Sequence, residues 1–198
     1  MADLSKDQKL IDRMLEGADV HGELAAEVGI PRQAAKVGNF AMLYGASQTS
    51  IARQTGMDVE QAVGLKQAWS DLYPQAAQAM ENWTEDAYDT GRTVLPNGWS
   101  PKIAIGDFGS ILAYRAINYQ IQGWAAVVFK IAGIQLARAK LWHLTRMVVH
   151  DEFAVSLPKD QAQELLGAIM HAATVTTKRM IYTTGGELYG SHWGIKDD

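Results

Sequence analysis

The sequence is organised around residues 31–45, which read PRQAAKVGNFAMLYG. Proline suits the first position of a helix and glycine the residue just beyond its end, so Pro31 and Gly45 predict a helix with marked limits. Four side chains spaced by four share one face of it: Arg32, Lys36, Phe40 and Tyr44. Such a face can bind a triphosphate through its cations and stack its rings on a base. The same spacing also suits an ordinary surface helix, so spacing alone leaves both interpretations open.

The composition indicates a globular protein. With 198 residues, 47% of them hydrophobic, the chain can bury the core of one domain or of two small ones. It has no cysteine, which excludes disulfides and thiolate metal sites. No apolar run has the length of a membrane span and the start lacks the apolar core of a signal peptide, so we expect a cytoplasmic protein without a membrane partner. The net charge of −4 argues against tight non-specific binding of nucleic acid by the whole chain, but permits a local basic groove.

The first half of the sequence has the periodicity of helices. Start and stop residues bracket further helical segments, which we expect over residues 5–16, 19–26, 47–54, 58–72 and 74–91. The first of them should begin with a capping box at Ser5. The region before residue 92 is therefore predicted to be almost entirely helical.

The second half has mixed patterns. Pro96-Asn97-Gly98 between extended runs predicts a hairpin over residues 92–105. A long apolar helix should follow over about 109–142, interrupted or bent near Gln122-Gly123. Two strands at 147–149 and 153–157, a helix over 158–180 and a last strand at 187–189 complete the pattern. A helical first half followed by a helix-backed sheet is one α+β unit.

The opening stretch carries a resemblance to a known family. Its pattern Arg32-x-x-x-Lys36-x-x-Asn39-Phe40-x-x-x-Tyr44-Gly45 resembles the nucleotide-binding helix of family A DNA polymerases, the bacterial DNA polymerase I and related phage enzymes. The resemblance implies that Arg32 and Lys36 hold the triphosphate and that Lys36 protonates the leaving pyrophosphate. It implies that Phe40 faces the sugar and that Tyr44 stacks at the template-base position. Asp19-Val20-His21 resembles a shorter element of the family, whose His contacts the incoming phosphates.

A pair of carboxylates lies between two predicted strands, in His150-Asp151-Glu152. Carboxylate oxygens are the ligands that Mg²⁺ prefers, although the tripeptide alone also suits a solvated acidic turn. Val149-His150-Asp151-Glu152-Phe153 resembles the second carboxylate motif of the same family. This implies that Asp151 is a catalytic metal ligand, that Glu152 is an accessory carboxylate and that His150 contacts DNA.

A third motif lies in residues 114–123, which read YRAINYQIQG. Asn118-x-x-x-Gln122-Gly123 resembles the helix of the family that follows the minor groove of the primer–template duplex. Amide side chains there can donate to acceptors that all base pairs present on that side. The resemblance assigns this role to Asn118 and Gln122. Tyr114 stands where many members have Arg, and Arg115, one position later, is a further candidate for DNA binding.

The two ends of the sequence also resemble parts of the family. Gly190-Ser191-His192-Trp193 resembles its closing strand, and residues 1–7 resemble the segment after its first carboxylate motif. That motif supplies the Asp that bridges two metal ions in this chemistry. Asp3 and Asp7 lie at a helix start, where capping explains them better. We therefore expect a second polypeptide that carries the first carboxylate motif and the thumb.

The resemblance predicts an α+β protein with mostly helical fingers (residues 1–91) followed by a helix-backed antiparallel palm sheet (residues 92–198), incomplete relative to a full polymerase. The function it implies is template-directed transfer of a deoxynucleotide to a primer 3′ hydroxyl, with Mg²⁺ as the cofactor. Its partners would be primer–template DNA and deoxynucleoside triphosphates, in a bacterial or phage-infected cell.

Three other interpretations remain open at this point. The chain could be a non-catalytic remnant or binding module that keeps the fold and some nucleotide affinity. It could be related to the single-subunit RNA polymerases, which share the architecture, although Phe40 and Glu152 favour DNA synthesis. It could also be an excised fragment of a longer enzyme.

Overall fold

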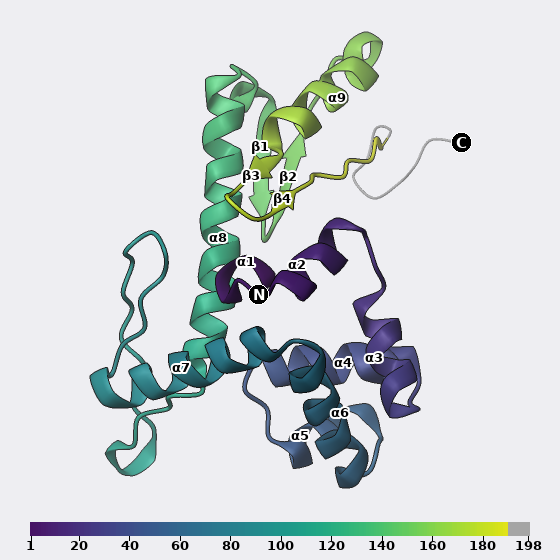
Figure 1. Ribbon diagram of the computed structural model, residues 1–198. Coiled ribbons are helices and arrows are strands. Elements are labelled where there is room, and N and C mark those ends of the chain that lie inside the picture. The colour runs from purple at the N-terminus through teal and green to yellow at the C-terminus, as the bar shows by residue number, and fades with distance from the viewer. Residues whose placement is uncertain (190–198) are drawn as a thin grey trace. The chain divides into compact units, whose positions relative to one another are not determined.

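A computed structural model describes residues 1–189 of the chain (Figure 1). The chain divides into two compact units, Met1–Trp124 and Ala125–Asp198. Helices dominate the first, and the second adds two small antiparallel sheets, which confirms the predicted α+β class. The expected closing strand around Gly190-Ser191-His192-Trp193 lies outside the described residues. Within residues 1–189, no helix is long and apolar enough to cross a membrane.

Seven helices precede residue 92 in the first unit: α1 (Ala2–Ser5), α2 (Gln8–Leu15), α3 (Val20–Val28), α4 (Arg32–Leu43), α5 (Gln48–Thr55), α6 (Val59–Leu72) and α7 (Pro74–Thr90). Side chains that accept a backbone N–H at the start fix several of these limits: Asp7, Asp19, Ser47 and Asp58. Such N-caps satisfy donors that the helix itself leaves unpaired. Gly29, Gly56 and Gly91 end α3, α5 and α7 in the left-handed conformation.

The first predicted helix is wrong in one respect, because two helices replace the single one expected over 5–16. Lys6 takes a left-handed conformation with φ 60°, and Asp7, instead of Ser5, caps α2. The buried carboxylate of Asp7 accepts from Leu10 N at 3.0 Å. Its other oxygen accepts from Gln75 N at 3.1 Å and from Ala76 N at 3.2 Å, at the start of α7. One side chain thus caps two helices that lie far apart in the sequence.

Helix α4 packs against α3, α5 and α6. Its buried positions are Ala35, Gly38, Asn39, Ala41 and Met42. Gly38 permits the close approach, since a Cβ there would lie 2.4 Å from Cδ2 of Leu65 in α6. This packing leaves the opposite face of α4 to solvent.

The expected hairpin over 92–105 turns back on itself but forms no strand between residues 92 and 114. Isolated bridges join Arg92 to Lys102 and Ile105 to Ile111, and a turn joins Leu95 to Trp99, with the Leu95 N–H donating to the Trp99 carbonyl at 2.8 Å. Two prolines lack the N–H that a regular ladder needs. The buried side-chain amide of Gln120, in α8 (Arg115–Arg138), donates to Thr93 Oγ1 at 2.7 Å and to the Val94 carbonyl at 2.8 Å.

The long helix α8 runs from Arg115 to Arg138, without interruption at Gln122-Gly123. It begins later than expected because a second turn and the 3₁₀ helix η1 (Asp107–Gly109) occupy the preceding residues. In that turn the Leu112 N–H donates to the Ala104 carbonyl at 3.0 Å.

In the second unit, β1 (Thr145–Val149) and β2 (Glu152–Val155) form the predicted antiparallel hairpin. Phe153 of β2 stacks on Phe129 of α8, with centroids 4.2 Å apart, and meets Trp142 of the 3₁₀ helix η2 (Trp142–Leu144) edge-on at 5.9 Å. These rings hold the hairpin against residues 125–138 of α8, so this sheet is helix-backed as expected.

The last predicted elements need correction. The 3₁₀ helix η3 (Lys159–Gln161) precedes α9 (Ala162–Ala173), which ends well before the expected limit at 180. The β-branched run from Thr174 to Thr177 favours extended backbone. It forms β3 (Val175–Thr176), which pairs with β4 (Ile181–Tyr182). The strand expected at 187–189 is absent, since that segment is irregular.

The division into units does not decide where fingers and palm meet. The contacts separate the chain after Trp124, inside α8, whereas the sequence placed the boundary at residue 91. Compact units and functional subdomains need not coincide. The assignment of 1–91 to fingers and 92–198 to palm therefore stays a prediction.

Asp7→Ala is expected to lower the free energy of unfolding by about 2–4 kcal/mol, because it leaves three backbone N–H groups at two helix starts without their carboxylate acceptor. Chemical denaturation followed by circular dichroism measures this loss. Asp58→Ala is the matched control, because its exposed carboxylate caps α6 alone and should cost about 1 kcal/mol. Equal losses in the two variants would contradict the double-cap interpretation.

Candidate nucleotide-binding face and acidic turn

The four side chains singled out on residues 31–45 all lie exposed on α4 and its C-cap: Arg32, Lys36, Phe40 and Tyr44. Phe40 is 44% and Tyr44 43% exposed, although large aromatic residues usually bury more of their surface. Tyr44 caps the helix, and Gly45 follows with φ 78°. We call these four residues the nucleotide face.

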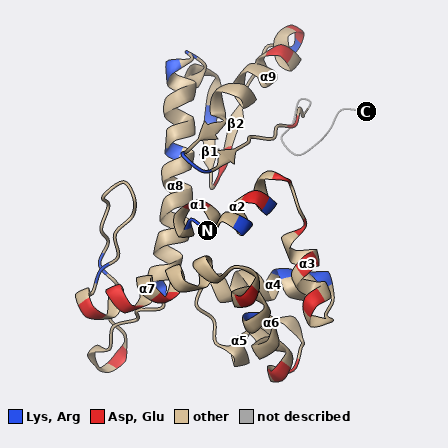
Figure 2. Cartoon of the chain, in the orientation of Figure 1, with Lys and Arg blue, Asp and Glu red and all other residues tan. Residues whose placement is uncertain are grey.

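Arg32 is held by a carboxylate from the start of α3. Its Nε donates to Asp19 Oδ2 at 2.6 Å and its Nη2 to Asp19 Oδ1 at 2.9 Å, so the ion pair is bidentate. The hydrogen bonds from Arg32, helped by the Gly22 N–H, lower the pKa of Asp19 to about 2. The same contacts raise the pKa of Arg32. Figure 2 shows the acidic residues of α3 beside the basic residues of α4. With these pKa shifts, Asp19 and Arg32 are both charged at neutral pH.

His21 lies between the nucleotide face and the core of the unit. Its ring centroid is 5.6 Å from that of Phe40, and its Nδ1 lies 3.2 Å from Nδ2 of Asn39. Burial lowers the pKa of His21, and the positive charges of Arg32 and Lys36 lower it further. The imidazole is thus neutral at pH 7. Because the Asn39 amide donates to Nδ1, the ring proton resides on Nε2.

Lys36 is the second cation of the nucleotide face. Its side chain is exposed, and no carboxylate among residues 1–189 forms a salt bridge with it. Its ammonium group is therefore available to an anion, whereas the Arg32 guanidinium is already engaged.

The acidic turn lies at the tip of the β1–β2 hairpin in the second unit. His150 has φ 53°, which turns the chain, and Glu152 begins β2 opposite Val149. His150, Asp151 and Glu152 are all exposed. The hairpin thus presents two carboxylates to solvent, as the sequence predicted for this segment.

Two carboxylates make an incomplete metal site. Among the described residues, no three His, Cys, Asp or Glu side chains come together as a set of metal ligands. The oxygens of Asp151 and Glu152 are of the right kind for Mg²⁺, which usually completes its coordination shell with water and substrate phosphate. They fit part of a two-metal site, so a further ligand is required.

The DNA-binding candidates of α8 lie in its first turns. Arg115 and Gln122 are exposed, whereas Asn118 is half-buried and its Oδ1 has no hydrogen-bond partner among the described residues. Asn118 and Gln122 are four residues apart and share one face. The buried amide of this helix is Gln120, which holds the preceding loop.

Two glycines of the motifs have packing roles in the first unit. A Cβ on Gly123 would lie 2.7 Å from Leu95 Cδ2 and 3.2 Å from Trp99 Cζ3, so glycine lets the 92–105 loop pack against α8. A Cβ on Gly45 would lie 2.9 Å from Cδ2 of Tyr114. Gly45 therefore brings the aromatic end of the nucleotide face next to the residue that precedes α8.

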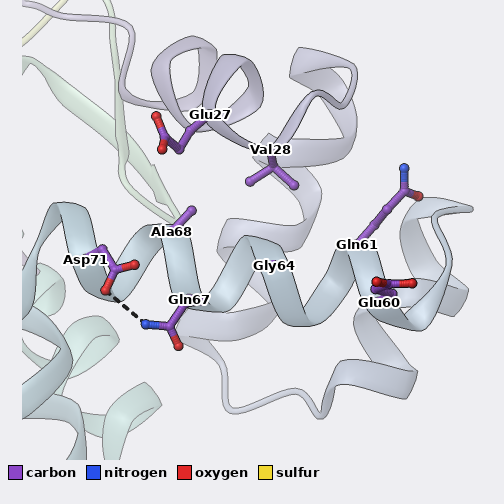
Figure 3. Close-up of a pocket in the computed structure, with 8 residues that line it drawn as sticks. All are labelled: Glu27, Val28, Glu60, Gln61, Gly64, Gln67, Ala68 and Asp71. Atoms are coloured by element: carbon purple, nitrogen blue, oxygen red, sulfur yellow. Dashed lines mark hydrogen bonds between the residues drawn. The ribbon is translucent and has the colours of Figure 1, made fainter.

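A hollow of the first unit lies elsewhere, between α3 and α6 (Figure 3). It is an open depression of about 490 Å³, and its lining includes Glu27, Val28, Glu60, Gly64 and Asp71. Its lining contains no cation, so the carboxylates would repel a triphosphate. None of the candidate residues lines it.

The sequence gives no role in the nucleotide face to three residues that the structure places around it. Asp19 and Gly22 belong to the helix expected over 19–26, and Asn39 belongs to the helix expected within 31–45. The signal for Asp19 was present, because an Asp directly before a helical run is a typical N-cap. Its pairing with Arg32 depends on how α3 packs against α4, which one sequence does not reveal.

Comparisons with known proteins place the chain in a family. The profile of DNA polymerase family A matches residues 1–185. The DNA polymerase of Mycobacterium phage L5 is 28% identical over 98% of this chain and 32% of its own length. DNA polymerase I of Streptococcus pneumoniae is 29% identical over 98% of this chain and 24% of its own length. The thermostable DNA polymerase I of Thermus filiformis is 32% identical over 83% of this chain and 22% of its own length.

A solved structure supports the fold. It is described as the POL domain of Pol1 from M. smegmatis in complex with DNA primer-template and dNTP, and it matches 87% of this chain and 34% of its own with a TM-score of 0.72 at 23% identity. This chain spans about a quarter to a third of the length of the relatives named here. The family profile covers most of the sequence, and the chain belongs to DNA polymerase family A.

Proposed function

We propose that this chain forms the nucleotide-binding fingers and a large part of the palm of a DNA-directed DNA polymerase. The reaction is template-directed transfer of a deoxynucleotide to a primer 3′ hydroxyl. The observation that carries this proposal is the nucleotide face: two cations and two rings, all exposed and in line along α4, with the neutral His21 beside them. The family membership supports the same reaction.

The residues of the nucleotide face contact different parts of the substrate. Arg32 and Lys36 bind the triphosphate with charge-assisted hydrogen bonds, and Lys36 protonates the leaving pyrophosphate. His21 adds a neutral donor from Nε2 to a phosphate oxygen. Phe40 faces the sugar, and Tyr44 stacks at the position of the template base.

The duplex contacts come from polar side chains of both units. Asn118 and Gln122 donate to minor-groove acceptors that are common to all base pairs, which tests the shape of a pair without reading its sequence. Arg115 and His150 contribute further DNA contacts. The primer–template DNA and the deoxynucleoside triphosphate are therefore the proposed partners.

Members of this family use divalent metal ions, and we propose Mg²⁺ as the ion. Asp151 would ligate it, with Glu152 as an accessory carboxylate. The ion would supply charge neutralisation at the phosphates and a more acidic primer hydroxyl. The described residues provide only part of such a ligand set, and we propose that a further polypeptide carries another carboxylate together with the thumb.

Asp151→Ala is expected to lower primer extension by the completed enzyme more than about 100-fold, since metal-ion assistance contributes several kcal/mol to such a step. The unfolding curve should be unchanged, because Asp151 is exposed. Asp160→Ala removes another exposed acid of the second unit and is the control. Near-normal extension by Asp151→Ala would refute the assignment of the site.

Phe40→Tyr is expected to raise incorporation of dideoxynucleotides about 3- to 10-fold relative to deoxynucleotides, because a phenol hydroxyl adds about one hydrogen bond beside the sugar. Competitive single-nucleotide extension measures the ratio. Tyr44→Phe removes a hydroxyl from the same face away from the sugar and should leave discrimination unaltered. An unchanged ratio in Phe40→Tyr would mean that residue 40 does not face the sugar.

The need for a further polypeptide has its own test. Mixing this chain with a candidate polypeptide that carries the first carboxylate motif and thumb should produce primer extension greater than the sum of the two components alone. Absence of any gain, with both components folded, would instead favour a non-catalytic binding module.

A further inference from the structure

The guanidinium that should bind phosphate is already occupied. Arg32 presents two of its donors, Nε and Nη2, to the two oxygens of Asp19, at 2.6 Å and 2.9 Å. The planar fork of arginine binds carboxylate and phosphate with the same parallel geometry. Asp19 thus fills the position that two oxygens of a phosphate group would take.

The backbone of α3 also holds Asp19. As the N-cap of α3, its Oδ1 accepts the Gly22 N–H at 3.1 Å in addition to Arg32 Nη2. Gly22 leaves the required space, because a Cβ there would lie 2.5 Å from Asp19 Oδ2 and 2.9 Å from its Cγ. A side chain at position 22 would therefore displace the carboxylate from this position.

We propose that Asp19 is a built-in competitor for polyphosphate at Arg32, held in place by the absence of a side chain at Gly22. The inference rests on the proposed function and adds a positioning residue to it. A polyphosphate must displace the carboxylate before Arg32 can bind it. Asp19 therefore weakens the binding of every anion that contacts Arg32. Displacing the Asp19 carboxylate is least favourable for a singly charged anion.

The rest of the nucleotide face fits this arrangement. Lys36 has no carboxylate partner among the described residues, so it can engage a phosphate chain while Arg32 is still paired. Once Arg32 exchanges partners, Asp19 keeps the Gly22 N–H and still caps α3. The exchange therefore does not require α3 to unfold.

Two variants release Arg32 by different means. Asp19→Asn removes the charge, while asparagine remains a good N-cap. Gly22→Ala leaves every charge in place, but its Cβ must push the carboxylate away from its present position. Agreement between the two excludes a general change in net charge as the cause.

Each variant has a matched control in α6. Asp58→Asn alters an N-cap of the same kind, whose carboxylate accepts a backbone N–H and forms no salt bridge within residues 1–189. Gly64→Ala adds a methyl group to a helix interior where the nearest side-chain atom, Val28 Cγ1, is 3.9 Å away. Neither change touches Arg32.

The test is calorimetric titration of the full chain with inorganic tripolyphosphate, without metal or DNA. Asp19→Asn and Gly22→Ala should each tighten binding about two- to fivefold, the range that an exposed ion pair covers. Asp58→Asn and Gly64→Ala should not. In an Arg32→Gln background the gain from Asp19→Asn should vanish, since the competed group is gone.

A second readout follows Arg32 itself. Phenylglyoxal should modify Arg32 faster in both releasing variants than in the wild type, as mapped by mass spectrometry, while circular dichroism confirms that they remain folded. Unaltered affinity in both variants, or a gain that persists with Arg32→Gln, would overturn the proposal. Faster modification without any binding of tripolyphosphate would overturn the polyphosphate role. Because these assays involve no primer extension, their result is separate from that of the polymerase assay.

Discussion

The close contact between α4 and α6 at Gly38 is the constraint on which the nucleotide face depends. Leu65 occupies the space that a side chain at position 38 would need, and Ala35 and Met42 bury the same side of α4. Side chains four residues apart on a helix share a face, so burying one side directs the other into solvent. This packing leaves the rings of Phe40 and Tyr44 exposed.

Helix α4 is unfavourable in isolation. Cations at a helix N-terminus oppose the macrodipole, and Arg32 and Lys36 repel each other at a spacing of four. A carboxylate from α3 relieves part of this, since Asp19 neutralises Arg32 and caps its own helix with the same group. The arrangement breaks local rules of helix design at the place where ligand binding is proposed, which is where such violations are expected.

Different kinds of interaction hold the segments together within each of the two units. In the first, single polar side chains join distant segments: Asp7 caps α2 and α7, and Gln120 holds the 92–105 loop. In the second, stacked rings fix the β1–β2 hairpin against α8, so the acidic turn rests on apolar packing. The turn itself carries little of that packing, because His150, Asp151 and Glu152 are exposed.

By itself the sequence determined the helical first half, the α+β class, the limits of most helices and the order of the family motifs, because caps, prolines, glycines and periodicity act within a few residues. It could not show that α1 and α2 are separate, that α9 ends at Ala173, or that the 92–105 loop forms no strand. The tertiary structure decided those points, as it decided that Asp19 meets Arg32, Asn39 meets His21 and Gly22 leaves room for a carboxylate. Asp19 and Arg32, like His21 and Asn39, are far apart in the chain, and their contacts depend on how α3 packs against α4, which local spacing does not encode.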